Sequence, residues 1–480
     1  MTQTNRVLDC TSIINYSFVM KKLLIILFLT ISLSVSARTY YVASSGGSDM
    51  NMGTNINKPW ASWQRAFSVA EGGDTVYIRG GIYTPSYYKS GGGILAIDPD
   101  GGIGHDGEPG KPVCYFNYPG EKPILDCSNM IPAGNFNIGI ALTRVDYVKF
   151  RGLTIRNIRQ VKNFVECFGI SATDCTNHSY ENITIHNVDG NAFRYLGAWR
   201  HPGKPPYYYP EHAIFPGDST FYINCDAYNC CDSLPRTKEG NPTPGGAADG
   251  FKTYNEAGSF ILFEGCRAWN CSDDGFDPGG SCVVYLNRCW SFGNGYLKGD
   301  GTGFKTGGVS VDLPGITRLI SNCLSVSNVA GYFLLEYEDY YRTNARFYNN
   351  VSYRDERGYF FSLNPQHPVV LGVWKNNIAY GWKTVPFSNA YQKYTESNNT
   401  WDFVSGFPGW KPAKDVVITD DDFVSLDSKQ LYQSRKPDGS LPEISFFKPA
   451  KGSDLIDSGT DVGLPFYGKA SDIGYSEFKD

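Results

Sequence analysis

The sequence lacks the features on which several common functional assignments rest. Its formal net charge is −5, so no excess of positive charge points to nucleic acid or to an acidic membrane surface. Methionine is scarce, at 5 of 480 residues, whereas glycine, tyrosine and phenylalanine are frequent, at 53, 33 and 29. So much glycine and aromatic residue disfavours long helices and predicts many short strands joined by tight turns.

A zinc motif is also missing, because no Cys-x-x-Cys pair is matched by another. The chain has 13 cysteines, and four recur at the same point of a repeating unit: Cys225, Cys266, Cys289 and Cys323. Equivalent positions of stacked coils form an interior ladder, where cysteine serves as a small buried hydrophobe. We expect mostly free buried thiols. We also expect one or two bridges among Cys230, Cys231, Cys271 and Cys282.

A long apolar run occurs near the start of the chain, over residues 23–35. Met20-Lys-Lys precedes it and Ser36-Ala37 follows it. A basic start, a short apolar run and small residues at a cleavage point are typical of a signal peptide. We therefore expect residues 1–37 to be an upstream extension plus signal peptide. The mature chain would then be exported to the periplasm, the cell surface or the medium; an uncleaved anchor is the alternative.

Residues 59–70 predict the clearest helix in the chain. Trp60, Trp63, Phe67 and Ala70 share one face at helical spacing. A single amphipathic helix before a long run of strands would cover the open apolar end of a solenoid.

A repeat of 25 to 28 residues follows. It is marked by Gly-Phe or Gly-Tyr pairs that begin at Gly250, Gly275, Gly303, Gly331 and Gly358. Periods of 20–50 residues indicate a solenoid, and three short strands per turn indicate a parallel β-helix. A β-propeller blade would need about 40 residues. We expect one all-β domain over 38–480, with regular turns over about 111–400 and a tail, 401–480, that packs along the coil or caps it.

Two proline-rich excursions interrupt the repeat between about 194 and 248. The first contains Trp199 and Tyr207, Tyr208 and Tyr209, and the second contains Arg236 and Lys238. Loops on a rigid scaffold commonly build its binding cleft. These excursions directly precede an acidic cluster.

The acidic cluster is Asp273-Asp274-Gly-Phe-Asp277, with Asp249-Gly-Phe one turn earlier and Gly-Phe-Lys305 one turn later. Adjacent turns are about 4.8 Å apart, so these charges should lie in one small volume. Strict alternation would put Asp274 on the side of the buried Phe276. We interpret the glycine as a corner that turns the carboxylates outward.

Four carboxylates so close together need a cation between them. Oxygen ligands favour Ca²⁺, and no His or Cys is placed to select a softer metal. The alternative is that the aspartates cap turns, as a lone aspartate usually does.

Lys305 should lie near the metal without binding it. We expect neighbouring positive charges to lower its pKa toward the neutral amine, although a solvated surface lysine is the alternative. A neutral amine beside Ca²⁺ suits removal of the proton α to a carboxylate. In a uronic acid this proton is on C5, and loss of the glycosidic oxygen from C4 completes a β-elimination.

In these motifs the sequence resembles the family nine polysaccharide lyases, over about residues 38–400. The resemblance implies a right-handed parallel β-helix that cleaves pectin backbones with Ca²⁺ and a lysine base. It implies Asp249, Asp273, Asp274 and Asp277 as ligands and Lys305 as the base. Lys252, in a second Gly-Phe-Lys, departs from this pattern, and we expect it to bind a substrate carboxylate.

The family includes lyases for homogalacturonan and for rhamnogalacturonan. The aromatic residues of the insert suit the uncharged faces of rhamnose and favour rhamnogalacturonan slightly. We expect a monomer acting on an acidic plant cell-wall polysaccharide, with no nucleic-acid partner. Further candidates for carboxylate binding are Arg236, Lys238, Arg354 and Arg357.

Two other classes stay open. An inverting galacturonan hydrolase on the same fold would use the aspartates as acid and base and would need neither Ca²⁺ nor a lysine. A Ca²⁺-stabilised carbohydrate-binding solenoid would have no catalysis at all.

Overall fold

The computed structural model places most of the chain, and we describe only the well-placed residues. These are residues 37–132, 134–197, 218–235, 244–255, 259–280, 282–307, 313–335, 343–362, 371–389, 394–403 and 418–479. Every element below belongs to the compact unit of residues 39–480. The expected leader up to residue 36, the aromatic insert (Trp199, Tyr207–Tyr209), Arg236 and Lys238 lie outside the described residues.

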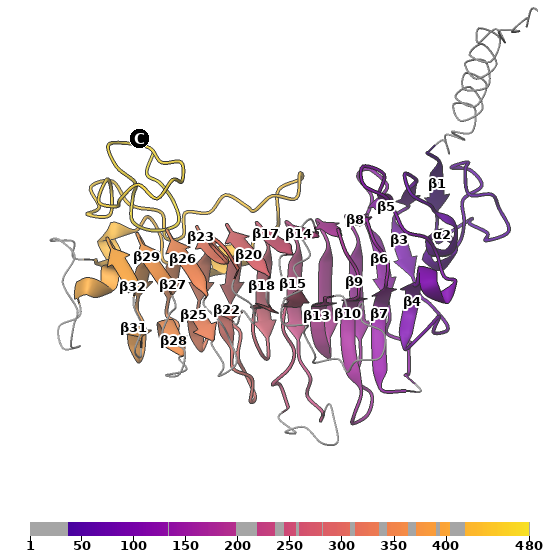
Figure 1. Ribbon diagram of the computed structural model, residues 1–480, viewed down its shortest axis with the longest axis horizontal. Coiled ribbons are helices and arrows are strands. Elements are labelled where there is room, and N and C mark those ends of the chain that lie inside the picture. The colour runs from indigo at the N-terminus through magenta and orange to yellow at the C-terminus, as the bar shows by residue number, and fades with distance from the viewer. Residues whose placement is uncertain are drawn as a thin grey trace, which may run out of the picture. The chain divides into compact units, whose positions relative to one another are not determined.

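Residues 39–397 form three parallel sheets that wind as one coil, as the repeat predicted (Figure 1). Each full turn adds one strand to each sheet. The first sheet has 12 strands: β1 (Thr39–Val42), β2 (Thr75–Ile78), β5 (Val113–Asn117), β8 (Val148–Arg151), β11 (Ser179–Glu181), β14 (Ser219–Ile223), β17 (Phe260–Glu264), β20 (Val283–Asn287), β23 (Arg318–Ser321), β26 (Asn344–Tyr348), β29 (Leu371–Lys375) and β32 (Tyr394–Ser397).

The other two sheets have 10 strands each. The second is β3 (Gly81–Tyr83), β6 (Pro123–Asp126), β9 (Thr154–Ile158), β12 (Thr184–Val188), β15 (Asp226–Cys230), β18 (Arg267–Cys271), β21 (Trp290–Phe292), β24 (Leu324–Val326), β27 (Val351–Tyr353) and β30 (Ile378–Tyr380). The third is β4 (Gly93–Ile97), β7 (Phe136–Thr143), β10 (Glu166–Thr173), β13 (Gly190–Leu196), β16 (Phe251–Asn255), β19 (Phe276–Gly280), β22 (Thr302–Gly307), β25 (Ala330–Leu335), β28 (Arg357–Ser362) and β31 (Val385–Asn389). Pairing thus begins well before residue 111.

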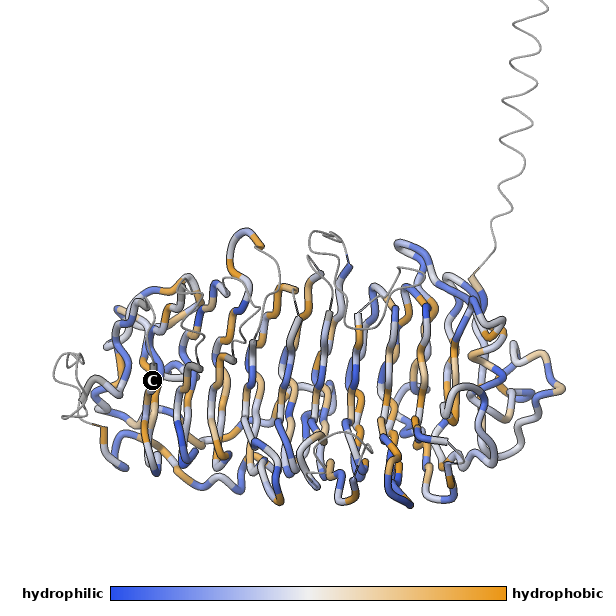
Figure 2. The backbone as a smooth tube through the Cα atoms, turned by 60° about the horizontal axis from the view of Figure 1, so that its bottom comes forward, coloured by the Kyte–Doolittle hydropathy of each residue, from blue (hydrophilic) through white to orange (hydrophobic). Residues whose placement is uncertain are grey.

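Alternation along each strand separates the core from the surface, and hydrophilic and hydrophobic residues interchange along the stacked strands in Figure 2. On the inner face of the third sheet, six aromatic rings stack nearly parallel with centroids 4.7 to 5.1 Å apart. They are Phe193, Phe251, Phe276, Phe304, Tyr332 and Tyr359. This aromatic ladder fixes the register of the strands, because a shift of one residue would expose every ring.

Gly250 and Gly275 lie at the corners just before β16 and β19, whereas the glycines of the three later Gly-aromatic pairs are the second residues of β22, β25 and β28. A Cβ on Gly275 would collide with Ser291 Oγ, and a Cβ on Gly250 would lie 2.7 Å from the Gly275 carbonyl oxygen. Glycine is needed at these two positions because there is no space for a side chain. The turn of the chain there frees the preceding aspartate from the alternation that would point it into the core.

The cysteine ladder is present, and Cys225, Cys266, Cys289 and Cys323 are fully buried. The expected bridges are wrong, because all 12 cysteines of the described chain are free thiols. Cys230 and Cys271 occupy neighbouring inward positions of β15 and β18. Burial raises the pKa of the Cys271 thiol well above its usual value, which keeps the thiol protonated.

The N-terminal helix is shorter than expected. α2 (Trp63–Val69) begins after Ser62, whose side chain accepts a hydrogen bond from Arg65 N, and ends where Ala70 turns extended. Phe67 packs against the rings of Tyr115 and Phe150 inside the first turns, as a cover for the apolar end should. At seven residues, α2 is the longest helix in the described chain and is too short to cross a bilayer.

The described part of the C-terminal segment contains no strands, and its helices are short 3₁₀ turns: η2 (Thr400–Phe403), η3 (Asp420–Asp422) and η4 (Ser428–Tyr432), with η1 (Pro99–Gly101) earlier in the chain. Residues 418–479 pack on the outer face of the second sheet, where Phe447 contacts Tyr353. Arg435 adds an ion pair at 2.7 Å to Asp226 of β15. The tail therefore covers one outer face and leaves the third sheet to other contacts.

Candidate metal and catalytic site

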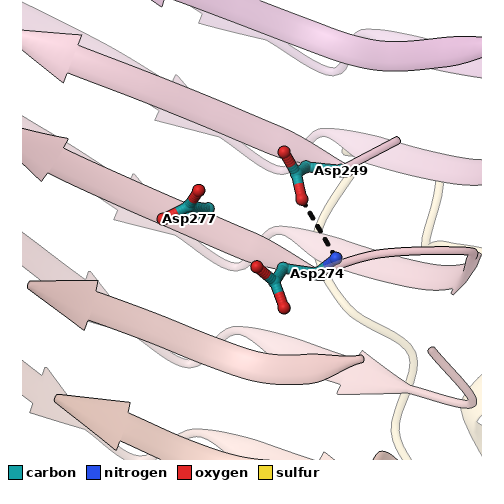
Figure 3. Close-up of side chains that lie close together, drawn as sticks. All are labelled: Asp249, Asp274 and Asp277. Carbon is teal, nitrogen blue, oxygen red and sulfur yellow. Dashed lines mark hydrogen bonds between the residues drawn. The ribbon is translucent and has the colours of Figure 1, made fainter. Parts of the chain in front are cut away.

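The predicted carboxylates gather where two consecutive turns enter the third sheet (Figure 3). Asp249 precedes β16, and Asp273 and Asp274 precede β19. Asp277 lies within β19 and points outward, because Phe276 beside it points into the core. One oxygen each of Asp249, Asp274 and Asp277 lies within 4.8 Å of the others. All four carboxylates are buried.

Backbone amides of the following turn hold these carboxylates in place. Asp274 N donates to Asp249 Oδ1 at 3.0 Å, the contact drawn in Figure 3. Thr302 N donates to Asp274 Oδ1 at 2.7 Å, and Asp300 N donates to Asp273 Oδ1 at 2.7 Å. In each of these carboxylates one oxygen thus accepts a backbone hydrogen bond, and the other oxygen can face a cation.

Two lysines contact the remaining oxygens. Lys252 Nζ lies 3.0 Å from Asp249 Oδ2 and 2.6 Å from Asp277 Oδ2. Lys305 Nζ lies 2.9 Å from Asp274 Oδ2 and 3.0 Å from Asp300 Oδ2. Lys252, expected to bind a substrate carboxylate, is in this structure a direct partner of the acidic cluster.

The lysines are held in the charged form. Burial opposes the charge, but Asp274, Asp277 and Asp273 raise the pKa of Lys305 well above its usual value. Asp249 and Asp277 likewise raise the pKa of Lys252 against the effect of burial. The expected lowering of the Lys305 pKa is wrong for this arrangement. The carboxylates lie closer to the Lys305 amine than any other positive charge does, and they raise its pKa.

The carboxyl groups differ in their charge state. Burial, with Asp249 and Asp274, raises the pKa of Asp273 to about 9. Burial also raises the pKa of Asp274 to about 7, against the contact with Lys305. Burial opposes ionisation of Asp277 too, but Lys252 and Lys305 hold its pKa below the usual value. The two lysines thus neutralise only part of the cluster.

The donor set fits a hard divalent cation. It consists of carboxylate oxygens alone, buried and converging, which is the ligand chemistry that Ca²⁺ prefers. Asp300 extends the set, since it forms a second convergent group with Asp273 and Asp274. The sequence analysis missed Asp300, although this aspartate precedes a glycine, Gly301, as Asp249 and Asp274 do.

The two remaining described candidates differ in position. Arg357 begins β28 and aligns with Ala330 and Thr302, in line with Asp274 along the third sheet. Arg354 is exposed at the corner after β27, with its guanidinium 4.8 Å from the Tyr353 ring centroid. Tyr353 receives the C-terminal segment, so the structure does not bring Arg354 to the acidic cluster.

The chain is thus a parallel β-helix that carries buried carboxylates and two lysines on one outer face. The family model for the Pel9A-like, right-handed β-helix region matches residues 40–377, so the chain belongs to this family, polysaccharide lyase family nine. It is a polysaccharide lyase.

Three relatives are similar over nearly their whole length. Pectate lyase L of Dickeya dadantii is 29% identical over 463 residues, which cover 92% of this chain and 90% of the relative. The crystal structure of pectate lyase Pel9A matches with a TM-score of 0.66 at 25% identity, covering 93% of this chain and 98% of Pel9A. A rhamnogalacturonan lyase structure matches with a TM-score of 0.64 at 25% identity, covering 86% and 97%.

Proposed function

We propose that the protein is a Ca²⁺-dependent lyase that cleaves a galacturonate-containing pectin backbone by β-elimination, with rhamnogalacturonan slightly favoured over homogalacturonan. The observation that carries this proposal is the placement of the Lys305 amine 2.9 Å from Asp274, beside converging carboxylate oxygens of the third sheet. The relatives named pectate lyase and rhamnogalacturonan lyase support both substrates.

Asp249, Asp273, Asp274 and Asp277 would hold the cation. When bound, Ca²⁺ would supply positive charge to the substrate carboxylate and so acidify the proton on the adjacent carbon. Lys252 already contacts oxygens of Asp249 and Asp277. An ammonium and a metal ion would compete for these oxygens, and a displaced Lys252 could pair with the carboxylate of the substrate instead.

Lys305 would act as the base. Its Nζ takes the proton from C5, the C5 electron pair forms the C4–C5 double bond, and the C4–O bond breaks. The leaving oxygen departs with the other part of the chain and acquires a proton from solvent. Asp274 and Asp300 then stabilise the new ammonium through the contacts at 2.9 and 3.0 Å. Lys305 must first be neutral, which requires that the charge of Asp274 be engaged elsewhere.

Absorbance at the wavelength of the conjugated C4–C5 double bond tests the proposal. Wild type should generate this absorbance from rhamnogalacturonan or polygalacturonate with Ca²⁺, and a chelator should abolish it. Chain shortening without the absorbance would instead favour the inverting hydrolase. Binding of either polymer without shortening would favour the non-catalytic solenoid.

Export follows from the proposed substrate, because a plant cell-wall polymer does not enter the cell. Residues 1–37 supply the candidate leader. N-terminal sequencing of the protein recovered from cell fractions should find Arg38 as the first residue. A protein that retains the apolar run would contradict cleavage and would point to an anchor.

A further inference from the structure

The outer face of the third sheet carries one column of side chains that passes through the acidic cluster. Pairing of β13 with β16 and of β16 with β19 aligns Arg194, Lys252 and Asp277. Phe276 pairs with Phe304, which places Lys305 next after Asp277. Neighbours in this column are one strand spacing apart, about 4.8 Å.

Beyond Lys305 the column becomes aromatic. Lys305 pairs with Phe333, and Phe333 pairs with Phe360. Both phenylalanines are partly exposed, whereas the adjacent Tyr332 and Tyr359 are buried in the aromatic ladder. The ring centroids of Phe333 and Phe360 are 4.9 Å apart, with the planes inclined at 41°. Two rings therefore form a continuous apolar surface directly beside the proposed base.

Arg357 supports this surface from one side. Its guanidinium lies 4.7 Å from the centroid of the Phe360 ring, a cation–π contact that restricts the ring. Arg357 was a candidate for carboxylate binding, and this contact gives it a positioning role for Phe360 instead.

The two directions along the column differ in chemistry. Toward Arg194 and Lys252 the column is cationic and suits a uronate. Toward Phe333 and Phe360 the column presents two apolar ring faces, and a carboxylate seated on these faces would lose hydration. The apolar face of a neutral deoxy sugar would lose little water there and would gain contact with the rings.

We propose that Phe333 and Phe360 form a platform that seats the neutral sugar next to the reacting galacturonate, so that the enzyme prefers a backbone in which rhamnose and galacturonate alternate. This inference rests on the proposed lyase function and adds the residues that set its specificity. A homogalacturonan would place a charged sugar at every position over the platform.

The test compares kcat/KM for rhamnogalacturonan and for polygalacturonate in wild type, Phe333→Ala and Phe360→Ala. Each substitution should lower the rhamnogalacturonan to polygalacturonate ratio of kcat/KM by roughly tenfold, mostly through KM, as loss of one aromatic contact predicts. Phe333→Tyr, which keeps the ring, should restore most of the ratio and serves as the folded variant if Phe333→Ala melts early.

Phe116→Ala is the matched control. Phe116 is a partly exposed phenylalanine on the outer face of the first sheet, with the Arg151 guanidinium 3.9 Å from its ring centroid. It reproduces the local setting of Phe360 away from the column, and its removal should leave the ratio unchanged.

Three results would overturn the inference. They are an equal loss on both polymers, no loss on rhamnogalacturonan, and a wild type that cleaves polygalacturonate alone; each leaves the lyase function intact. Cleavage of neither polymer overturns the lyase function itself. Calorimetry with rhamnogalacturonan oligosaccharides then decides the platform, since weaker binding by Phe333→Ala supports it and unchanged binding refutes it.

Discussion

Two buried clusters of opposite charge lie on neighbouring faces of this β-helix, and they differ in how completely their charges are matched. Asp226 accepts two hydrogen bonds from Arg267, both at 2.8 Å, and one from Arg435 at 2.7 Å. Arg267 also donates to the Leu431 and Gln433 carbonyl oxygens, which fastens the C-terminal segment to β18. One carboxylate is thus paired with two guanidinium groups.

The acidic cluster has the reverse balance. Five carboxylates, those of Asp249, Asp273, Asp274, Asp277 and Asp300, share the ammonium groups of Lys252 and Lys305. The comparison teaches that burial and ion pairs do not by themselves identify a functional site. The surplus does: Asp226 has cations to spare, whereas the acidic cluster has oxygens to spare for one more cation.

The largest expected difference between the clusters is in catalysis. Lys305→Ala should lower kcat by about 10²–10⁴-fold, the usual contribution of a general base. Arg435→Met, in the other cluster, should leave kcat unchanged. Double-bond absorbance measures both variants. A Lys305→Ala variant with kcat within tenfold of wild type would remove Lys305 from the base role.

The second difference is in stability. Asp226→Ala should lower the free energy of unfolding by about 3–5 kcal/mol, because it leaves Arg267 and Arg435 buried without their counter-charge. Urea unfolding measures the change, and kcat of the folded variant should stay at the wild-type value. An Asp226→Ala variant as stable as wild type would mean that the ion pairs of Asp226 do not stabilise the fold.

An aspartate-to-asparagine substitution should change Ca²⁺ affinity in the acidic cluster but not at Asp226. Loss of a residue that only holds a metal ligand in place typically lowers metal affinity 10–100-fold. Asp274 is a proposed ligand itself, so Asp274→Asn should weaken Ca²⁺ binding by about 100-fold or more. Asp226→Asn is the control and should bind Ca²⁺ as wild type does. Calorimetric titration of both proteins decides, and equal affinities would show that Asp274 is not a ligand.

The clusters should also respond to pH in opposite directions. The raised pKa values of Asp273 and Asp274, about 9 and about 7, mean that the folded chain keeps protons that the unfolded chain has released. Stability from these groups is present below about pH 4 and falls as pH rises through 7 to 9. Arg267 and Arg435 lower the pKa of Asp226 against the effect of burial, so its stabilisation is lost only in acid.

Melting with and without Ca²⁺ at pH 5 and pH 8 checks this contrast. The increase in Tm on adding Ca²⁺ should be larger at pH 8, because the cation compensates carboxylates that are ionised there. In Asp274→Asn the increase should become small at both values. An increase that is larger at pH 5 would contradict the assigned charge states.

The smallest expected effect concerns Lys252. Lys252→Met removes an ammonium that contacts two of the proposed ligands, so Ca²⁺ should bind roughly tenfold more tightly, about 1.4 kcal/mol. Lys436→Met, which breaks an exposed pair with Glu443, is the matched control. Weaker Ca²⁺ binding by Lys252→Met would mean that Lys252 supports the site and does not compete for it.

The fold could be predicted from the sequence because each turn of the β-helix repeats the same residue pattern. The Gly-aromatic pairs give the position of every strand in the third sheet from β16 to β28, and the same register carries Asp249, Asp274, Asp277 and Lys305 to one place. Extending that register by two turns would also have found Phe333 and Phe360, which follow Gly331-Tyr and Gly358-Tyr. The Gly-Tyr pairs thus carried the information needed to place these two phenylalanines.

Other features could not be read from the repeat. The contact of Lys305 with Asp300 is one of them, because Asp300 lies in a loop outside the register. The length of α2 was set by the Ser62 cap and not by its apolar face. The clamp on Asp226 joins residues 209 positions apart, Asp226 and Arg435, and no local pattern announces such a contact.

The aromatic ladder gives this scaffold a scale. Because each ring marks the same position of successive turns, a side chain moved from one marked position to the next travels one strand spacing, about 4.8 Å, and keeps its direction. Chemistry on the outer face can therefore be relocated by exchanging residues between equivalent positions, while the core behind it stays unchanged. The segments between strands differ in length, but a single residue added inside a strand would turn every later position of that strand inside out. For a protein engineer, the residues at these outward positions can be exchanged, but the distance between successive positions is fixed by the strand spacing.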